Sequence, residues 1–370
     1  MVSLPFTDPV ATPAVVTPTL KVRRQGSSDA GLGQGALDLL GASPNPDAWM
    51  AHLLSMRMTL ACGDHVDNVV LHLLETEQTP ATALGDRLQI ALGYGDDGET
   101  PLFSGTVAQV ETTLSGYRRL VLTSPLLQLA QGRLNGSFEE QSAGDIIRAL
   151  LGETDVTAGE ISPGSQYPFY VVSDRSPLLA HINVLCQQQN WLCYCGADGS
   201  LNARTVGEKP PVRTLAYGVD LLELRHWQRS PALAGVKVVG DGAAASKGAD
   251  AWNWLTKETQ ATGEAGAGNV VVSQGALRDN AASKSFAQSI LADSERAANR
   301  VQLQTSAAPD ILPGAPFDIS GAPTEAANGT FVAERVVISY DQRSGFISTI
   351  KAFNRAAGTG DGAGPGGGLL

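Results

Sequence analysis

The stretch from Arg87 to Leu122, RLQIALGYGDDGETPLFSGTVAQVETTLSGYRRLVL, constrains the fold of this chain most strongly. From Leu88 to Leu92 apolar residues alternate with polar or small ones, which is typical of a half-buried strand. The glycines and aspartates of residues 93 to 98 tolerate positive φ and predict a chain reversal. Two further strands follow, separated by a turn at residues 115 to 116. The stretch therefore predicts an antiparallel meander.

Gly105 lies inside the second strand of this meander, within the apolar run LFSGTV. A glycine at such a position indicates a bulge or a close approach of another backbone segment. Both features let a sheet curl, and a curled meander predicts a small barrel. The meander contains no side chains arranged for catalysis.

Upstream of the meander we expect an extended tail over residues 1 to 17, and then strands. The predicted strands begin at Leu20 to Val22 and continue with Trp49 to Leu60 and Asn68 to Glu75. A short segment at Ala36 to Leu40 follows a Gly/Ser-rich loop.

Downstream, helical and strand patterns alternate. Apolar residues at helical spacing, with Ser142 as N-cap and Gly152 as a stop, predict a helix. A strand is expected at Tyr167 to Val172. A second helix is predicted with Ser176 as cap and Pro177 at its first position. It leads into a WLCYC strand and a hairpin turn, DGSL.

The last third predicts strands at Leu221 to Arg225 and Val236 to Gly240, a flexible insertion at residues 257 to 269, and a helix from Arg278 to Arg300. An LPG turn follows. The final hairpin pairs Phe331 to Tyr340 with Gly345 to Phe353.

These motifs, in this order, resemble the late control protein D and VgrG-like baseplate hub family of phage tails and other contractile injection systems. The LFSGTVAQVE strand, the helix followed by the DGSL hairpin, and the Ala-rich helix followed by LPG and a closing hairpin carry the resemblance. It extends over residues 20 to 355, with insertions near 240 to 270.

The resemblance implies an α+β, β-rich chain with two similar antiparallel β-barrel domains and an α+β region between them, assembling as a ring-shaped trimer. The expected first barrel spans residues 18–124, the middle domain 125–205, and the second barrel 206–355. The second barrel is expected to include inserted loops at 240–270 and the helix at 278–300. Residues 356–370 are expected to be a flexible Gly-rich tail.

The implied function is structural: a trimeric hub that joins a sixfold tail tube to a threefold spike and lines a central channel. VgrG chains continue into a spike domain, and this sequence shows none, so the resemblance implies a separate spike protein. The other expected partners are the tail tube, baseplate wedge proteins and a tape-measure protein or effector in the channel. The resemblance implies no enzymatic activity and no cofactor.

The acidic balance, with a net charge of −11, argues against a DNA-binding or anionic-membrane surface. Residues 1 to 20 lack a basic start and a continuous apolar core, so we expect neither a signal peptide nor a membrane anchor. These features predict that the chain is kept in the cytoplasm. The resemblance implies assembly in the bacterial cytoplasm and incorporation into a tail or injection particle.

His181, Cys186, Cys193 and Cys195 are the residues that would form a metal or catalytic site if one exists. Cys193 and Cys195 share a strand face, but His181 and Cys186 are five apart, a poor spacing for one face of a helix. Paired CxxC motifs are absent from the sequence. We therefore interpret these thiols as buried packing residues and predict no catalytic, cofactor or metal site.

Other candidate sites have similarly simple explanations. His65 and His72 fit sheet-surface or interface positions, and Asp96-Asp97-Gly98 fits a polar turn rather than a calcium loop. Glycine-rich stretches at 31–35 and 240–248 match no nucleotide-binding motif. A carbohydrate- or wall-binding β protein and a Cys/His enzyme remain alternative classes, and Trp252 and Trp254 are the aromatic candidates for the former.

Overall fold

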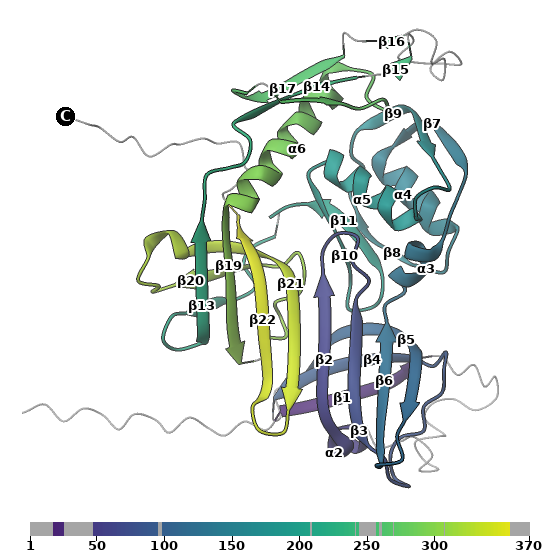
Figure 1. Cartoon of the computed structure of the whole chain (residues 1–370), viewed down its shortest axis with the longest axis vertical. Helices are drawn as coiled ribbons and strands as arrows, with labels where there is room; N and C mark the ends of the chain where they lie inside the picture. Colours follow the sequence, from purple (N-terminus) through teal and green to yellow (C-terminus); the bar gives the residue numbers. More distant parts are fainter. Residues whose placement is uncertain are drawn as a thin grey trace, which may run out of the picture.

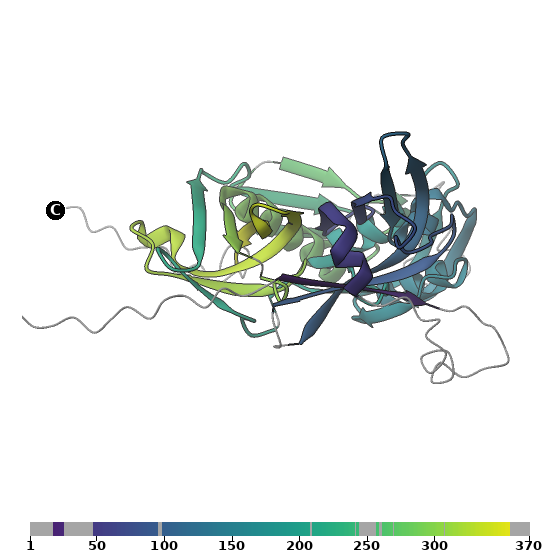
Figure 2. The same ribbon diagram turned by 90° about the horizontal axis from the view of Figure 1, so that it is seen from below.

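The structure, a computed structural model, describes residues 18–25, 47–94, 98–207, 209–240, 242–243, 257–258, 261–268, 270–306 and 308–355. A large sheet fills the lower part of the molecule in Figure 1, and most of the helices lie above it. Viewed from below in Figure 2, the early strands lie beside the late ones. The predicted α+β, β-rich class is confirmed.

The early part of the large sheet contains six strands and one short helix. They are β1 (Pro18–Gln25), α2 (Asp47–His52), β2 (Leu53–Ala61), β3 (Asn68–Leu74), β4 (Arg87–Tyr94), β5 (Glu99–Thr112) and β6 (Tyr117–Thr123). The predicted meander is confirmed, because β4 pairs with β5 and β5 with β6, both antiparallel. A Cβ atom on Gly105 would lie 2.5 Å from the Thr123 carbonyl oxygen, which is the close approach that the glycine predicted.

The late part of the sheet comes from the second half of the chain. Its elements are β12 (Thr214–Ala216), β13 (Leu221–Gln228), β19 (Asn299–Ser306), β20 (Pro316–Ser320), the 3₁₀ helix η2 (Glu325–Ala327), β21 (Gly329–Asp341) and β22 (Gly345–Asn354). The predicted closing hairpin is confirmed, and Gly345 after its turn has a φ of 68°.

Both parts form one 12-stranded sheet, because β2 pairs antiparallel with β21. The order is β1-β4-β5-β6-β3-β2-β21-β22-β19-β13, with β20 joined to β21 and β12 to β20. A single hydrophobic core contains apolar side chains from both parts, including Leu60 and Val336, which face each other across the joint. The described pairings run from β1 to β13 without returning, so barrel closure stays a prediction.

The middle of the chain packs around a second core. Its elements are α3 (Leu126–Gln131), β7 (Gly136–Ser142), α4 (Ala143–Gly152), β8 (Ala158–Ile161), β9 (Gln166–Val172), α5 (Leu178–Gln188), β10 (Trp191–Cys195) and β11 (Leu201–Thr205). Ser142 caps α4 as predicted, since its hydroxyl accepts a hydrogen bond from the Asp145 N–H. The DGSL hairpin is also confirmed, because β10 and β11 pair antiparallel.

The segment between β13 and β19 extends this second core. It contains β14 (Gly235–Val239), β15 (Gly242–Ala243), β16 (Lys257–Glu258), β17 (Thr262–Gly266), β18 (Val270–Ser273) and α6 (Asn280–Ala298). Val236, Val238 and Ala287 pack with the apolar residues of α4 and α5 rather than with the large sheet. The inserted sheet and helix thus share their core with the middle region, and the predicted domain boundaries stay a proposal.

Three predictions about these elements were wrong. Residues 49 to 52 belong to the helix α2 rather than to a strand. Trp49 is buried whereas Ala51, which would share its face in a strand, is exposed. Pro177, not Ser176, is the N-cap of α5, since its ψ of 156° is extended. The insertion at 257–269 contains β17, which pairs with β14 and packs against α6.

Candidate functional site

The large sheet offers the candidate contact surfaces of this molecule, because in the described part of the chain no further strand pairs with either of its ends. In the described residues, β1 pairs only with β4, and β13 pairs only with β19. Open strand edges present unpaired backbone N–H and C=O groups and are ready to pair with another chain. The two edges are therefore candidate contact sites.

The β1 edge is fixed to the rest of the early strands by ion pairs. Lys21 pairs with Glu99 on β5. The Arg24 guanidinium donates to Asp86 at 2.8 Å, and Asp86 also accepts from the Ala83 N–H at 2.8 Å. Side chains of β1 thus reach β5 and the loop before β4, which holds this edge in one position.

The β13 edge is more exposed and more apolar. None of its eight residues is buried. Leu222 is 62% exposed and Val219, in the preceding turn, is 83% exposed. Tyr217 and Trp227 are also exposed. Large apolar side chains gathered at an open edge are typical of a surface that another protein covers.

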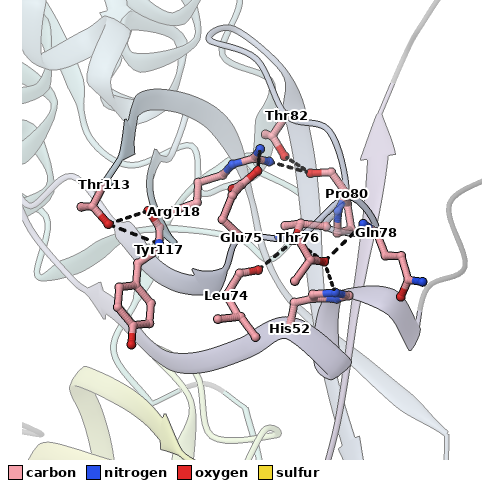
Figure 3. A network of polar contacts seen from close by, with 11 residues as sticks. His52, Leu74, Glu75, Thr76, Gln78, Pro80, Thr82, Thr113, Tyr117 and Arg118 are labelled. Atoms are coloured by element: carbon pink, nitrogen blue, oxygen red, sulfur yellow. Dashed lines mark hydrogen bonds and ion pairs between the residues drawn. The ribbon is translucent and has the colours of Figure 1, made fainter. Parts of the chain in front are cut away.

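A polar network holds the loop between β3 and β4 against β6 and α2 (Figure 3). The Arg118 guanidinium donates to Glu75 at 2.5 Å and to the Pro80 carbonyl oxygen at 3.0 Å. His52 of α2 lies 2.9 Å from the Thr76 hydroxyl. These contacts join the loop to β6 and α2 at one end of the early strands, so the network stabilises the loop rather than forming a reactive site.

The β10–β11 hairpin attaches the middle region to the sheet. The Ser104 hydroxyl of β5 donates to the Ala197 carbonyl oxygen at 2.8 Å. The Gly63 N–H donates to the Cys193 carbonyl oxygen at 2.8 Å. The hairpin thus contacts the early strands from both its turn and its first strand.

Asp67 is buried at this attachment, in the connection between β2 and β3. Its side chain is 1% exposed, and one carboxyl oxygen accepts from the Ala61 N–H at 2.9 Å. Burial raises the pKa of Asp67 to about 8, and the Ala61 hydrogen bond only partly opposes this. Nothing in the spacing of the sequence marks this aspartate as buried, and it is absent from the residues predicted from the sequence.

The structure brings together only part of the predicted Cys/His group. Cys186 and Cys193 share a hydrogen bond, which together with burial raises the pKa of Cys186. Burial also raises the pKa of Cys195. His181 lies against the Ser173 carbonyl oxygen at 3.0 Å. Protonated, buried thiols are poor nucleophiles and poor metal ligands, so the group fits packing better than chemistry.

Among the described residues, no cluster of three or more His, Cys, Asp or Glu side chains is placed to hold a metal ion. His72 is exposed on β3, where its Nδ1 lies 3.0 Å from the Ser55 hydroxyl. Burial lowers the pKa of the half-buried His65. The helices of the described residues are too short or too polar to span a membrane.

Several predicted features lie outside the described residues. They are the tails at 1–17 and 356–370, the segment Ala36 to Leu40, the glycine stretch 31–35, Asp96 and Asp97, most of 240–248, and Trp252 and Trp254.

Part of this chain matches a known protein family. Residues 68–174 match the family described as phage tail baseplate hub (GPD). This segment runs from β3 through the meander and α4 to the residues before α5. The predicted resemblance to the baseplate hub family is confirmed.

Solved structures share the fold of this chain over most of its length. A tail protein from Neisseria meningitidis is 10% identical with a TM-score of 0.65, covering 92% of this chain and 97% of its own. The 43 kDa tail protein of a Shewanella oneidensis prophage is 9% identical with a TM-score of 0.64, covering 92% and 99%. An E. coli component of the type VI secretion system is 10% identical with a TM-score of 0.56, covering 83% and 74%. At these identities the likeness concerns the fold alone, and no curated protein matches.

Proposed function

We propose that this chain is the hub subunit of a contractile baseplate. Three copies would form a ring that joins a sixfold tail tube to a threefold spike and encloses a channel. The observation that carries the proposal is the match of residues 68–174 to the baseplate hub family, and the tail-protein fold of nearly the whole chain supports it.

The two-part sheet supports the symmetry of this ring. Each chain supplies one early and one late β region, joined at β2 and β21. Three chains would place six β regions around the axis, a number that suits both a threefold and a sixfold partner. The open edges β1 and β13 lie at the two ends of the sheet order, where neighbouring copies would meet head to tail and close the ring.

The charge of the chain suits a channel wall. Each copy carries a net charge of −11, so three copies carry 3 × −11 = −33. Negative charge weakens the attraction of DNA phosphates to a protein surface. A channel through the ring would therefore let DNA or an acidic polypeptide pass without holding it.

The proposed partners follow from this role. They are a separate spike protein below the ring, the tail tube above it, wedge proteins around it, and a tape-measure protein or effector inside. Assembly takes place in the bacterial cytoplasm before the particle leaves the cell. The proposal assigns the chain neither enzymatic activity nor nucleic-acid binding nor membrane insertion.

Co-purification tests the proposed role. The chain, tagged and expressed together with the tube and spike proteins of its own particle, should be recovered in a complex with both. Electron microscopy of that complex should show a ring between tube and spike. Recovery of the chain without either partner, from cells that assemble intact particles, would contradict the proposal.

A further inference from the structure

A cavity of about 450 Å³ lies between α5, β9 and the segment that follows β18, outside the sheet edges discussed above. Its lining includes Tyr170, Val171, His181, Gln188 and Arg278, and it contains neither aspartate nor glutamate. The walls are mostly apolar or uncharged, with the Arg278 guanidinium as the permanent charge among them. A cavity of this composition favours a ligand with an apolar body and a negative group.

A chain of hydrogen bonds fixes how Gln188 meets this cavity. The Ser165 N–H and hydroxyl both donate to Gln189 Oε1, so Gln189 Nε2 is left to donate to the Tyr167 hydroxyl at 3.1 Å. Tyr167 in turn donates to Gln188 Oε1 at 2.5 Å. The remaining polar atom of this relay is Gln188 Nε2.

Gln188 Nε2 is buried and has no acceptor among the described residues. The residue is only 1% exposed, and a buried amide donor without an acceptor costs about 1–3 kcal/mol. The relay orients Oε1 toward Tyr167, which leaves Nε2 as the amide atom available to the cavity that Gln188 lines. An acceptor brought by a ligand would complete the relay.

The second polar feature of the cavity is the charged side chain of Arg278, which follows β18. It is 3% exposed, and burial lowers the pKa of its guanidinium. A carboxylate accepts hydrogen bonds from both an amide and a guanidinium, and a hydrogen bond to a charged group is stronger than one between neutral groups. Gln188 and Arg278 together therefore favour a carboxylate.

The shape of the cavity indicates an extended peptide. Phe169, Tyr170 and Val171 are consecutive on β9, and all three line it. Because consecutive strand residues point to opposite faces, a cavity that contacts all three runs along the edge of the strand. In the described residues β9 pairs with β7 alone, so this edge is open. Val171 and Val184 at the cavity are 47% and 39% exposed.

We propose that this cavity binds an extended acidic segment of another protein, which adds as a strand along β9 and places a carboxylate between Gln188 and Arg278. Addition of a strand to an open edge supplies backbone hydrogen bonds, and the cavity supplies side-chain specificity. Apolar neighbours of the acidic residue would contact Val171 and Val184. This binding goes beyond the proposed hub function and does not require ring assembly.

Calorimetric titration of the purified full chain tests the proposal. The probe is a capped heptapeptide of alternating valine and threonine with a central glutamate, and its control is the same peptide with glutamine. We expect the glutamate peptide to bind and the glutamine peptide to bind about tenfold more weakly, because the charged hydrogen bonds are lost. Equal binding of both peptides, or binding of neither, would overturn the proposal.

Variants locate the contact. Arg278→Met and Gln188→Met should each weaken the glutamate peptide about tenfold or more and leave the glutamine peptide nearly unchanged. Arg133→Met, which removes an exposed charge outside the cavity, should bind like the unmodified chain. Thermal melts show whether each variant is folded. Because the two substitutions are independent, one variant still tests the proposal if the other does not fold. Full affinity in both folded cavity variants would place the peptide elsewhere and refute the assignment.

Discussion

Asp67 is buried where the middle region attaches to the sheet, so the stability of the chain depends on the ionisation of its carboxyl group. Its raised pKa means that the folded chain binds a proton at Asp67 more tightly than the unfolded chain does. The contribution of Asp67 to the free energy of unfolding is therefore greatest below the ordinary pKa of aspartate. It falls as the pH rises toward about 8. The negative charge of Asp67 also contributes to the raised pKa of the Cys62 and Cys195 thiols.

Asp67→Asn should remove this dependence. The free energy of unfolding of the unmodified chain should fall by about 3–5 kcal/mol between pH 4 and pH 8 through this group, and the variant should lack that fall. Urea denaturation at several pH values measures it. Parallel pH profiles for the two proteins would show that Asp67 ionises normally.

Arg118 tests whether the network of Figure 3 stabilises the early strands. Arg118→Ala leaves the half-buried Glu75 carboxylate and the Pro80 carbonyl without this donor. We expect a loss of about 1–3 kcal/mol in the free energy of unfolding. The matched control is Arg119→Ala, since the Arg119 ion pair with Glu111 is exposed and should cost less than about 1 kcal/mol. Equal losses in the two variants would contradict the role given to the network.

At the scale of elements, the inserted sheet packs unusually close to α6. A Cβ atom on Gly263 of β17 would lie 2.0 Å from the Lys284 N atom of the helix backbone. Backbone cannot move aside as a flexible side chain does. The contact explains why a strand appears in a stretch that the sequence predicts as flexible: its two glycines serve close packing and a strand end, not mobility.

Gly263→Ala should therefore destabilise the chain by about 1–3 kcal/mol, through overpacking between β17 and α6. Gly152→Ala is the control, because no atom outside the neighbouring backbone of α4 itself lies within 4 Å of a Cβ at that position. The control should be neutral or stabilising by up to about 1 kcal/mol. Thermal and urea denaturation measure both, and a neutral Gly263→Ala would show that β17 and α6 separate easily.

Element prediction succeeded where one pattern dominated the local sequence. The meander, the Ser142-capped helix and the closing hairpin combine strong periodicity with unambiguous turn residues. It failed at Trp49, where the same apolar residues fit a helical turn as well as a strand. Whether Trp49 enters the core from a helix or a strand depends on β1 and the rest of the sheet, which a local window does not contain.

At the scale of the whole molecule, the joint between β2 and β21 links residues that are almost 300 positions apart. No local pattern encodes such a pairing, so the single continuous sheet was not predicted from periodicity. The buried position of Asp67 and the relay that ends at Gln188 depend on the same long-range packing. The family resemblance supplied the overall order of elements, and the contacts between them required the structure.

The mass of the purified chain in solution, measured by light scattering over a range of concentrations, tests the ring assembly most directly. One chain has a mass of 38.5 kDa, and we expect a species of three times that mass. Leu222→Glu, which places a charge on the open β13 edge, should reduce the mass to that of one chain. Leu114→Glu, at a fully exposed position in the turn between β5 and β6 and away from both ends of the sheet, should leave the trimer intact. A single-chain mass for the unmodified protein at every concentration, or a trimer that Leu222→Glu does not disturb, would contradict assembly through the ends of the sheet.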